Sequence, residues 1–321
     1  MYQLKFWNNF TAQVHEVHKF RHLPLRVQEI VLITHLRSHD KRMRTRLLFL
    51  LFIGFMLPGL LLANGKKITK IVLDAGHGGQ DVGARGKFSN EKDLTLDVAL
   101  RLGKMIKDSL PGVQVIYTRT TDVYPTLPER HEMANRAAGD VFVSIHVNST
   151  AARVQRIKTG TRTVKKGKKK VKVPVYKTIR HTETQASGTE TYVLGLHRNS
   201  EKEDAIGEYS ENIAEEPGLL NINDPQTAII IAQYSQAFLS RSVTLGTAIQ
   251  NQFGLQGRRN IGVKQMGLEV LAGSAMPGVL VEIGFINNPE EETYLNSAKG
   301  QHDVAYAIFK GIRAYKAEVE R

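Results

Sequence analysis

The 321-residue sequence contains no cysteine. Disulfides, thiol nucleophiles, cysteine-ligated zinc and lipid attachment through a lipobox cysteine are therefore excluded. Any bound metal must be held by histidine, aspartate or glutamate. Internal repeats are also lacking, and the hydrophobic content of 41% is ordinary for a globular protein. The chain is long enough to bury a full core in one large domain or two small ones.

Acidic residues are too few to balance the basic ones, but the excess of positive charge is confined to two segments of the chain. The formal net charge is +13. Residues 151–187 hold twelve Lys and Arg against one Glu, and residues 1–65 hold nine against three Asp and Glu. These segments carry +11 and +6, which leaves −4 for the rest of the chain. A nucleic-acid-binding domain would spread basic residues over a folded face, so no nucleic-acid partner is expected.

One long hydrophobic run is present, and it lies near the N-terminus. Basic residues 41–46 precede seventeen largely apolar residues, Leu47–Ala63. This order is typical of an export signal, with cleavage near Ala63 and a mature chain that starts near 64–66. A membrane-spanning helix is the alternative, because the run nearly reaches the ~20 residues that a bilayer requires. An uncleaved signal would anchor the protein, but Pro58 within the run favours cleavage.

The residues before this run do not fit an export signal, which ordinarily begins at the N-terminus. Residues 1–42 show no sustained amphipathic pattern, so Met43 is the predicted true start. Residues 1–65 are assigned to an N-terminal extension with the export signal, and residues 66–321 to a folded domain. The predicted location is outside the cytoplasm, either periplasmic or secreted.

A glycine-rich turn follows the first predicted strand of the folded domain. Lys70–Ala75 is short, rich in Ile and Val, and ends at turn residues, as a buried strand does. Gly76, Gly78 and Gly79 surround His77 and allow the backbone to turn sharply. His77 is therefore expected at the carboxyl end of a strand, where open α/β sheets place their chemistry.

Strand and helix patterns alternate along the rest of the domain. Successive βα units with short loops predict an α/β fold, with a mainly parallel sheet flanked by helices. The predicted strands are 113–118, 140–146, 189–194, 267–271 and 278–283, and the predicted helices are 90–109, 128–138, 226–252, 289–295 and 304–319.

Two charged segments interrupt this alternation. The basic insertion 151–187 predicts either a flexible, solvated loop or a twisted hairpin that protrudes from the domain. Its charge also suggests an electrostatic contact with an anionic surface, such as lipid headgroups or acidic wall polymers. Residues 199–224 are acidic and turn-rich, and a solvated loop is the favoured interpretation of them.

Four side chains are candidates for a metal site. His77 follows a predicted strand, His146 ends another, Glu91 lies in the first turn of a predicted helix, and Glu282 lies within an apolar strand. A carboxylate in an apolar strand is costly to bury unless it is paired or bound to metal. Together they predict a zinc site made of two histidines and one glutamate, with a second glutamate to spare. Each residue alone also has a structural explanation, such as a hydrogen-bonded core histidine or a helix-terminal acid.

The residues around these candidates resemble the zinc-dependent N-acetylmuramoyl-L-alanine amidases of bacterial cell-wall turnover. The resemblance covers about 70–315, except for the basic insertion, and implies one α/β domain with a six-stranded mixed sheet. Its motifs occur in order and are Asp74–Gly79, Asn90–Lys92, Thr118-Arg119, Leu127 with Arg130, Ala134-Asn135, Ser144–Asn148, Met276-Pro277 and Val281–Asn288.

The resemblance also implies a role for each of the four candidates. It makes His77, Glu91 and His146 the ligands of one Zn²⁺ and Glu282 the catalytic glutamate. The implied reaction is hydrolysis of the amide bond between N-acetylmuramic acid and L-alanine in peptidoglycan, for wall turnover or separation of daughter cells. A zinc peptidase acting on another stem-peptide bond, or an inactive wall-binding protein, are the alternatives.

Supporting and regulatory residues are predicted more coarsely. Asp74 and Asn148 are candidates for orienting the ligands, although capping or turn roles explain them equally well. Some members of the family carry a segment that covers the zinc until an activator protein removes it. Glu211, Glu215 and Glu216 are candidates for such an autoinhibitory contact by their location within 199–224.

Overall fold

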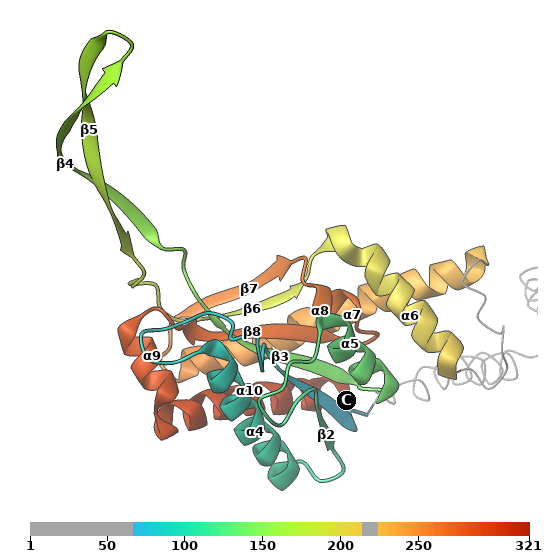
Figure 1. The fold of residues 1–321 in the computed structure, drawn as a ribbon. Helices are drawn as coiled ribbons and strands as arrows, with labels where there is room; N and C mark the ends of the chain where they lie inside the picture. The colour runs from blue at the N-terminus through green and yellow to red at the C-terminus, as the bar shows by residue number, and fades with distance from the viewer. Residues whose placement is uncertain (1–66, 214–223) are drawn as a thin grey trace, which may run out of the picture. The chain divides into compact units, whose positions relative to one another are not determined.

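A six-stranded sheet forms the centre of the molecule. The structure is a computed structural model that describes residues 67–213 and 224–321. The strands lie in the order β2-β1-β3-β8-β6-β7, and neighbouring strands are parallel except for β6 and β8 (Figure 1). The predicted α/β fold with a mainly parallel sheet flanked by helices is confirmed. Its strands are β1 (Lys70–Ala75), β2 (Gln114–Tyr117), β3 (Val141–Asn148), β6 (Thr189–Leu194), β7 (Asn260–Met266) and β8 (Gly278–Phe285).

Helices cover both faces of this sheet. Two further strands of the described chain pair only with each other and form a separate two-stranded sheet. The strand pair is β4 (Arg153–Lys166) and β5 (Lys169–His181). The helices are α4 (Glu91–Ser109), α5 (Leu127–Arg136), α6 (Asn199–Ile213), α7 (Pro225–Leu255), α8 (Glu269–Ala272), α9 (Pro289–Asn296) and α10 (Ala298–Val319), with a short 3₁₀ turn, η3 (Leu196–Arg198).

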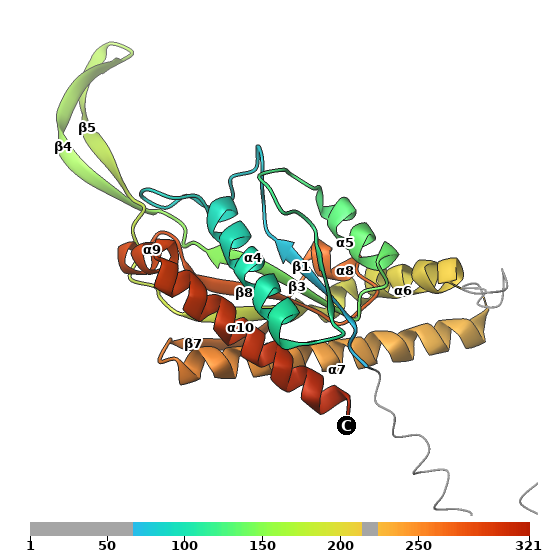
Figure 2. The ribbon, with the colours of Figure 1, turned by 90° about the horizontal axis from the view of Figure 1, so that it is seen from below.

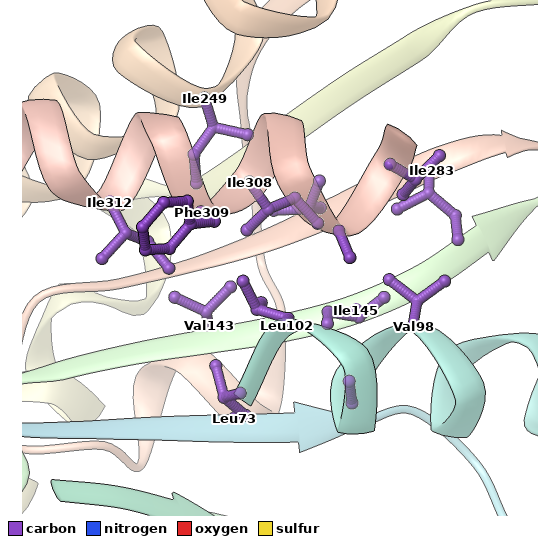
Figure 3. Close-up of a cluster of buried hydrophobic side chains, with 14 of the residues drawn as sticks. Leu73, Val98, Leu102, Val143, Ile145, Ile249, Ile283, Ile308, Phe309 and Ile312 are labelled. Atoms are coloured by element: carbon purple, nitrogen blue, oxygen red, sulfur yellow. The ribbon is translucent and has the colours of Figure 1, made fainter. Parts of the chain in front are cut away.

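Alternate strand residues face two different layers. Leu73, Val143 and Ile283 pack into the larger core beneath α4, α7 and α10 (Figure 3). Helices α4 and α10 lie side by side over this face (Figure 2). Phe142 and Leu280 point the other way, into a smaller core with α5 and α8. Because side chains alternate along a strand, the even-numbered residues of β3 and β8 share this second face.

Local sequence explains where several helices begin. The Thr126 hydroxyl accepts the Glu129 N–H, and the Glu129 carboxylate accepts the Thr126 N–H, which is a capping box at the start of α5. The Asn288 side chain accepts the first free N–H groups of α9 in the same way. In α4 the apolar residues recur at helical spacing and are buried, namely Leu94, Val98, Leu102 and Ile106.

One of the predicted strands is wrong. Residues 267–271 were expected as a strand, but β7 ends at Met266 and α8 begins at Glu269. A short apolar run does not separate a strand from a buried helical turn. The true strand, β7, is a largely polar edge strand, so hydrophobic alternation does not mark it.

The solvated loop expected for 199–224 is also wrong over its first part, which is helix α6. This helix is anchored because Ala205 and Ile206 are buried and the Lys202 ammonium donates three hydrogen bonds. The acceptors are the carbonyls of Leu271 and Met276 and the hydroxyl of Ser274. Burial lowers the pKa of Lys202 to about 7.

The basic insertion is a hairpin and not a loop. Strands β4 and β5 pair antiparallel over most of the segment, from Arg153 opposite His181 to Lys166 opposite Lys169. The hairpin alternative predicted for 151–187 is therefore confirmed.

The predicted N-terminal features lie outside the described residues. These are the extension and export signal 1–65, its apolar run Leu47–Ala63 and the candidate start Met43. Within 67–213 and 224–321, none of the helices combines the length and the apolarity needed to cross a bilayer.

The buried carboxylate of Glu292 fixes the loop that leads into α4. It accepts hydrogen bonds from the N–H groups of Lys87, Phe88 and Ser89 and from the Ser89 hydroxyl, at 2.8 to 2.9 Å. We predict that Glu292→Gln lowers the free energy of unfolding in urea by about 1–3 kcal/mol, because buried donors lose their acceptor. Asp108→Asn, which removes an exposed ion pair with Lys104, is the control and leaves the midpoint unchanged. Equal midpoints for both variants would contradict this role.

Candidate metal centre

His77 lies in a strained turn directly after β1. Its φ is +61°, in the left-handed region that non-glycine residues seldom adopt. Gly78 and Asp81 close the turn with a pair of backbone hydrogen bonds, and the Gly76 N–H donates to the Ile145 carbonyl at 3.0 Å. The Arg130 guanidinium donates to the His77 carbonyl at 2.7 Å. These bonds hold the imidazole at the carboxyl end of the sheet, as the sequence predicts.

A buried ion pair between Asp74 and Arg130 supports the turn that holds His77. The Arg130 guanidinium donates to the Asp74 carboxylate at 2.7 Å and to the Ala75 carbonyl at 2.8 Å. Asp74 also accepts the hydroxyls of Thr118 and Ser144, so each of its oxygens is satisfied. Burial opposes ionisation of Asp74, but Arg130 and the two hydroxyls lower the pKa of its carboxyl below the ordinary value. Asp74 therefore acts through Arg130 and does not touch the candidate ligands.

Arg119 supplies a second clamp on the same backbone. Its Nε donates to the Ala75 carbonyl at 2.9 Å, and its Nη2 donates to the Gly76 carbonyl at 2.8 Å. The guanidinium groups of Arg119 and Arg130 thus hold three successive carbonyls, those of Ala75, Gly76 and His77.

Glu91 is the first residue of α4, and its side chain lies in the candidate metal centre. Its side chain is buried, and its two oxygens accept the N–H groups of Ala84 and Val147 at 2.8 and 2.9 Å. These bonds place the carboxylate between the turn after β1 and the end of β3. The helix N-terminus adds a favourable field for the negative charge.

The three predicted ligands meet at one point. His77 Nε2 lies 3.1 Å from Glu91 Oε2, and His146 Nδ1 lies 2.9 Å from Glu91 Oε1. One ligand atom from each residue lies within 4.8 Å of the other two. Zinc bonds of about 2.0–2.2 Å place tetrahedral donors roughly 3.3–3.6 Å apart, so this spread fits a zinc ion after small adjustments.

Two glycines keep space for this cluster. A Cβ on Gly76 would lie 2.4 Å from the His146 imidazole. A Cβ on Gly83 would lie 2.6 Å from Glu91 Oε2 and 2.7 Å from the His77 ring, and the φ of Gly83 is +67°. Because neither position tolerates a side chain, the cradle around the three ligands is built into the backbone.

Asp81 is a member of the centre that the sequence analysis missed. Its carboxylate accepts a hydrogen bond from His77 Nδ1 at 2.8 Å, which leaves Nε2 directed at Glu91. A carboxylate on the second ring nitrogen is the usual way to orient a metal-bound histidine. The available signal was an acid four residues after His77 within the same glycine-rich turn.

The electrostatics match a site made for a cation. Burial alone would lower the pKa of His77, but hydrogen bonds and charges from Glu91 and Asp81 raise it to about 9. Glu91 raises the pKa of His146 against the same effect of burial. The two imidazoles in turn hold the pKa of Glu91 far below its ordinary value, although burial opposes this. The cluster thus stabilises positive charge beside a permanent carboxylate.

Glu282 lies next to the cluster on β8. It occupies the position opposite His146 in the β3–β8 pairing, and both residues are on the even-numbered face. Its Oε2 is buried, and no group in the described part of the chain hydrogen-bonds it. Burial raises the pKa of Glu282 to about 7, although the charge of His146 opposes this, and the charges of Glu91 and Glu190 add to the effect of burial. A buried, unpaired carboxylate oxygen beside three ligand donors fits a site that binds a further group.

Glu190 is the second residue that the sequence analysis missed. It lies directly opposite Glu282 in the antiparallel β6–β8 pair and is buried. The Asn148 amide and the Tyr192 hydroxyl donate to it, and Lys264 forms an ion pair with it. Asn148 therefore contacts this glutamate and not a candidate ligand. A glutamate flanked by threonines in a buried strand was the available signal.

The candidate autoinhibitory contact cannot be placed. The side chain of Glu211 and all of Glu215 and Glu216 lie outside the described residues, so their role stays a prediction.

Comparison with known proteins identifies the family. The model of a protein family described as N-acetylmuramoyl-L-alanine amidase matches residues 71–314. The chain belongs to this family. The resemblance inferred from the sequence motifs is confirmed, and the amidase domain includes all four candidate site residues.

Named amidases share this domain but differ in length. AmiC of Escherichia coli O6:H1 is 31% identical over 251 residues, covering 77% of this chain and 53% of that protein. The probable amidase AmiB of Haemophilus influenzae is 28% identical over 289 residues, covering 85% and 57%. The chain therefore spans little more than half the length of these amidases. A crystal structure of an amidase from Clostridium difficile 630 has a TM-score of 0.51 and 26% identity, and the match covers 78% of this chain and 97% of that one.

The buried pair of Asp74 and Arg130 makes a prediction about pH. Asp74→Asn leaves the Arg130 charge unpaired and lowers the free energy of unfolding at neutral pH by about 3–5 kcal/mol. Because the folded-state pKa of Asp74 is lowered, its stabilisation is present in full above the ordinary value of 3.8 and is lost as the pH falls through the folded value. Urea unfolding of wild type and variant should therefore show a difference that is constant at neutral pH and narrows in acid. A difference that grows in acid would contradict the assignment.

Proposed function

We propose that this protein is a zinc-dependent N-acetylmuramoyl-L-alanine amidase that hydrolyses the bond between N-acetylmuramic acid and L-alanine in peptidoglycan. Membership of the amidase family supports this reaction. The observation that carries the proposal is the convergence of His77, Glu91 and His146 beside the buried, unpaired oxygen of Glu282. Cell-wall turnover or separation of daughter cells is the proposed context.

His77 Nε2, the Glu91 carboxylate and His146 Nδ1 would hold one Zn²⁺. Zinc with three protein ligands supplies Lewis acidity and lowers the pKa of water to about 7. Asp81 keeps Nε2 of His77 directed inward through its bond to Nδ1. The strained turn and the two guanidinium clamps keep the donors in place before any substrate binds, so little reorganisation is needed.

Glu282 is the proposed proton carrier. Its unpaired oxygen accepts the proton of the attacking water while the water oxygen adds to the lactyl carbonyl carbon of the muramic acid. The same carboxyl then returns the proton to the amide nitrogen as the bond to L-alanine breaks. The products are a free L-alanine amine on the stem peptide and an intact glycan with a free lactyl carboxylate.

The proposed partners and location follow from this activity. Peptidoglycan is the substrate, and an exported protein, periplasmic or secreted, would reach it. An activator protein that displaces part of 199–224 is a further proposed partner. Ala substitutions of Glu211, Glu215 and Glu216 test it, since a true autoinhibitory contact would raise the basal activity when removed. The twelve cations of the basic insertion 151–187 are the proposed contact with an anionic surface.

Activity on purified peptidoglycan provides the first test. Glu282→Gln should lower the rate by about 10²–10⁴-fold, because it removes general acid–base catalysis, while zinc stays bound. Product analysis should find stem peptides with a free L-alanine amine. Cleavage of another stem-peptide bond would identify a zinc peptidase, and binding to the wall without hydrolysis by the wild type would identify an inactive binding protein. Asp108→Asn should retain wild-type activity.

Removal of the metal provides the second test. A ligand that binds only the folded state stabilises it by about 2.7 kcal/mol when its free concentration is 100 times its Kd. A chelator should therefore lower the Tm of wild type and of Glu282→Gln, and added zinc should restore it. Glu91→Gln should show no response to either reagent. An identical Tm for wild-type protein with zinc and with chelator would contradict the proposed site.

A further inference from the structure

The hairpin of β4 and β5 extends from the domain as a ribbon of two strands (Figure 1). The two strands pair with each other and with no other strand of the described chain. With 13 residues in β5, the ribbon is about 40 Å long at roughly 3.3 Å per residue. An isolated two-stranded ribbon buries little surface of its own and is marginally stable in water. Its length and exposure therefore call for a partner surface.

The pairing register places six of the seven aliphatic side chains of the ribbon on one face. Val164 lies opposite Val171, and Val173 lies two residues further along β5, on the same side. A bulge between Lys158 and Gly160 keeps Ile157 on this side, opposite Lys177. The apolar members of this aliphatic face are Ile157, Val164, Val171, Val173, Val175 and Ile179.

The aliphatic face has no core behind it. Ile157, Val171 and Val175 are 41%, 40% and 37% exposed. The remaining members are intermediate in exposure and not buried. Arg162 and Lys177 lie between members of this group on the same face. Six solvent-accessible aliphatic side chains gathered on one face are unusual on the surface of a soluble domain and mark a contact surface.

Cations lie on both faces of the ribbon. The opposite face carries Lys165, Lys170 and Lys172 near the turn and Lys158, Arg156 and Arg180 nearer the domain. The aliphatic face also carries cations beside its apolar members, namely Arg153, Arg162, Lys166, Lys169 and Lys177. Residues 153–181 contain twelve Lys and Arg and no Asp or Glu. The ribbon thus combines one aliphatic face with positive charge on both faces.

A single residue, Asn287, fixes the base of the ribbon. The Asn287 amide donates to the carbonyls of Thr150 and Thr182, which precede β4 and follow β5. Its Oδ1 accepts the Thr150 N–H, and the Asn287 carbonyl accepts the Thr184 N–H. Because Asn287 follows β8, both stems are tied to the strand that carries Glu282. The ribbon therefore begins at the same edge of the sheet as the metal centre.

We propose that the ribbon Arg153–His181 binds the surface of an anionic phospholipid bilayer. Its aliphatic face enters the boundary between headgroups and acyl chains, and its cations contact the phosphates. This inference rests on the proposed contact with an anionic surface but not on the proposed hydrolysis. A ribbon bound to the bilayer would hold the metal centre close to the side of the cell wall that faces the membrane.

The combination of an aliphatic face with cations on both faces distinguishes lipid from other occupants. A soluble polyanion, such as a wall polymer of glycerol phosphate, would satisfy the cations but leave the aliphatic face in water. A second copy pairing at the ribbon edge would bring like charges together, and Pro174 lacks the N–H that edge pairing needs. A bilayer supplies both an apolar interior and an anionic boundary.

Site-specific fluorescence tests the insertion. The chain has no cysteine, so Val173→Cys on the aliphatic face and Thr163→Cys on the opposite face each accept one nitrobenzoxadiazole label. Labelled full-length protein is mixed with vesicles of phosphatidylcholine alone or with an equal part of phosphatidylglycerol. The expected result is a brighter, blue-shifted emission from the label at 173 with anionic vesicles only, and a smaller change from the label at 163.

Sedimentation with the same vesicles separates charge from insertion. Lys165→Gln/Lys170→Gln/Lys172→Gln should weaken binding on the order of a hundredfold through lost attraction to the anionic surface. Val171→Ser/Val173→Ser/Val175→Ser should weaken it by about tenfold or more through lost apolar contact. The full chain is used throughout, so residues 1–66 contribute equally to every variant.

The outcomes are distinguishable from a failure of the hydrolysis. Release of stem peptides from soluble peptidoglycan fragments should be the same for both triple variants and wild type. A label at 173 that responds to soluble polyglycerol phosphate but not to vesicles would overturn the lipid assignment. Equal responses at 163 and 173, or a response without vesicles, would overturn the insertion of one face.

Discussion

The carboxylate of Glu91 is the group on which the candidate site depends. It joins an imidazole from the turn after β1 to an imidazole from β3, and two backbone N–H groups fix its oxygens. Without it, His77 and His146 would have no common hydrogen-bond partner. Its position follows from the fold, since α4 begins at Glu91 and the Glu292 carboxylate orders the residues just before it. The packing of α4 against the sheet is thus coupled to the geometry of the metal centre.

The register of the strands brings the remaining side chains together. His146 and Glu282 are neighbours because the parallel pairing of β3 and β8 places them opposite each other, with their side chains on the same face of the sheet. Glu190 joins them because β6 runs antiparallel beside β8. The second face of the sheet therefore gathers the His146 imidazole and the carboxylates of Glu282 and Glu190 at one edge, while the first face is closed by the apolar core (Figure 3). The ribbon begins at the same edge, which relates the catalytic and binding proposals in space.

Much of this arrangement could be predicted from the sequence, because it depends on local signals. Short Ile- and Val-rich runs marked β1, β3 and β8, and turn residues marked their ends, so the edge where His77 and His146 lie was evident. Asp81, Glu190 and the two guanidinium clamps were missed because their partners are brought close only by tertiary folding. The edge strand β7 was missed because it is polar, and the faces of the ribbon required a register that no sequence pattern fixes.

The central claim is that His77, Glu91 and His146 bind zinc together while Glu282 stays outside the ligand set. Diffraction from crystals of zinc-loaded protein, collected at the zinc absorption edge, tests it most directly. The account predicts one anomalous peak per chain, between His77 Nε2, the Glu91 carboxylate and His146 Nδ1, with Glu282 close by but not a ligand. Absence of a peak at this position, or a peak in which Glu282 replaces Glu91 as the ligand, would contradict it.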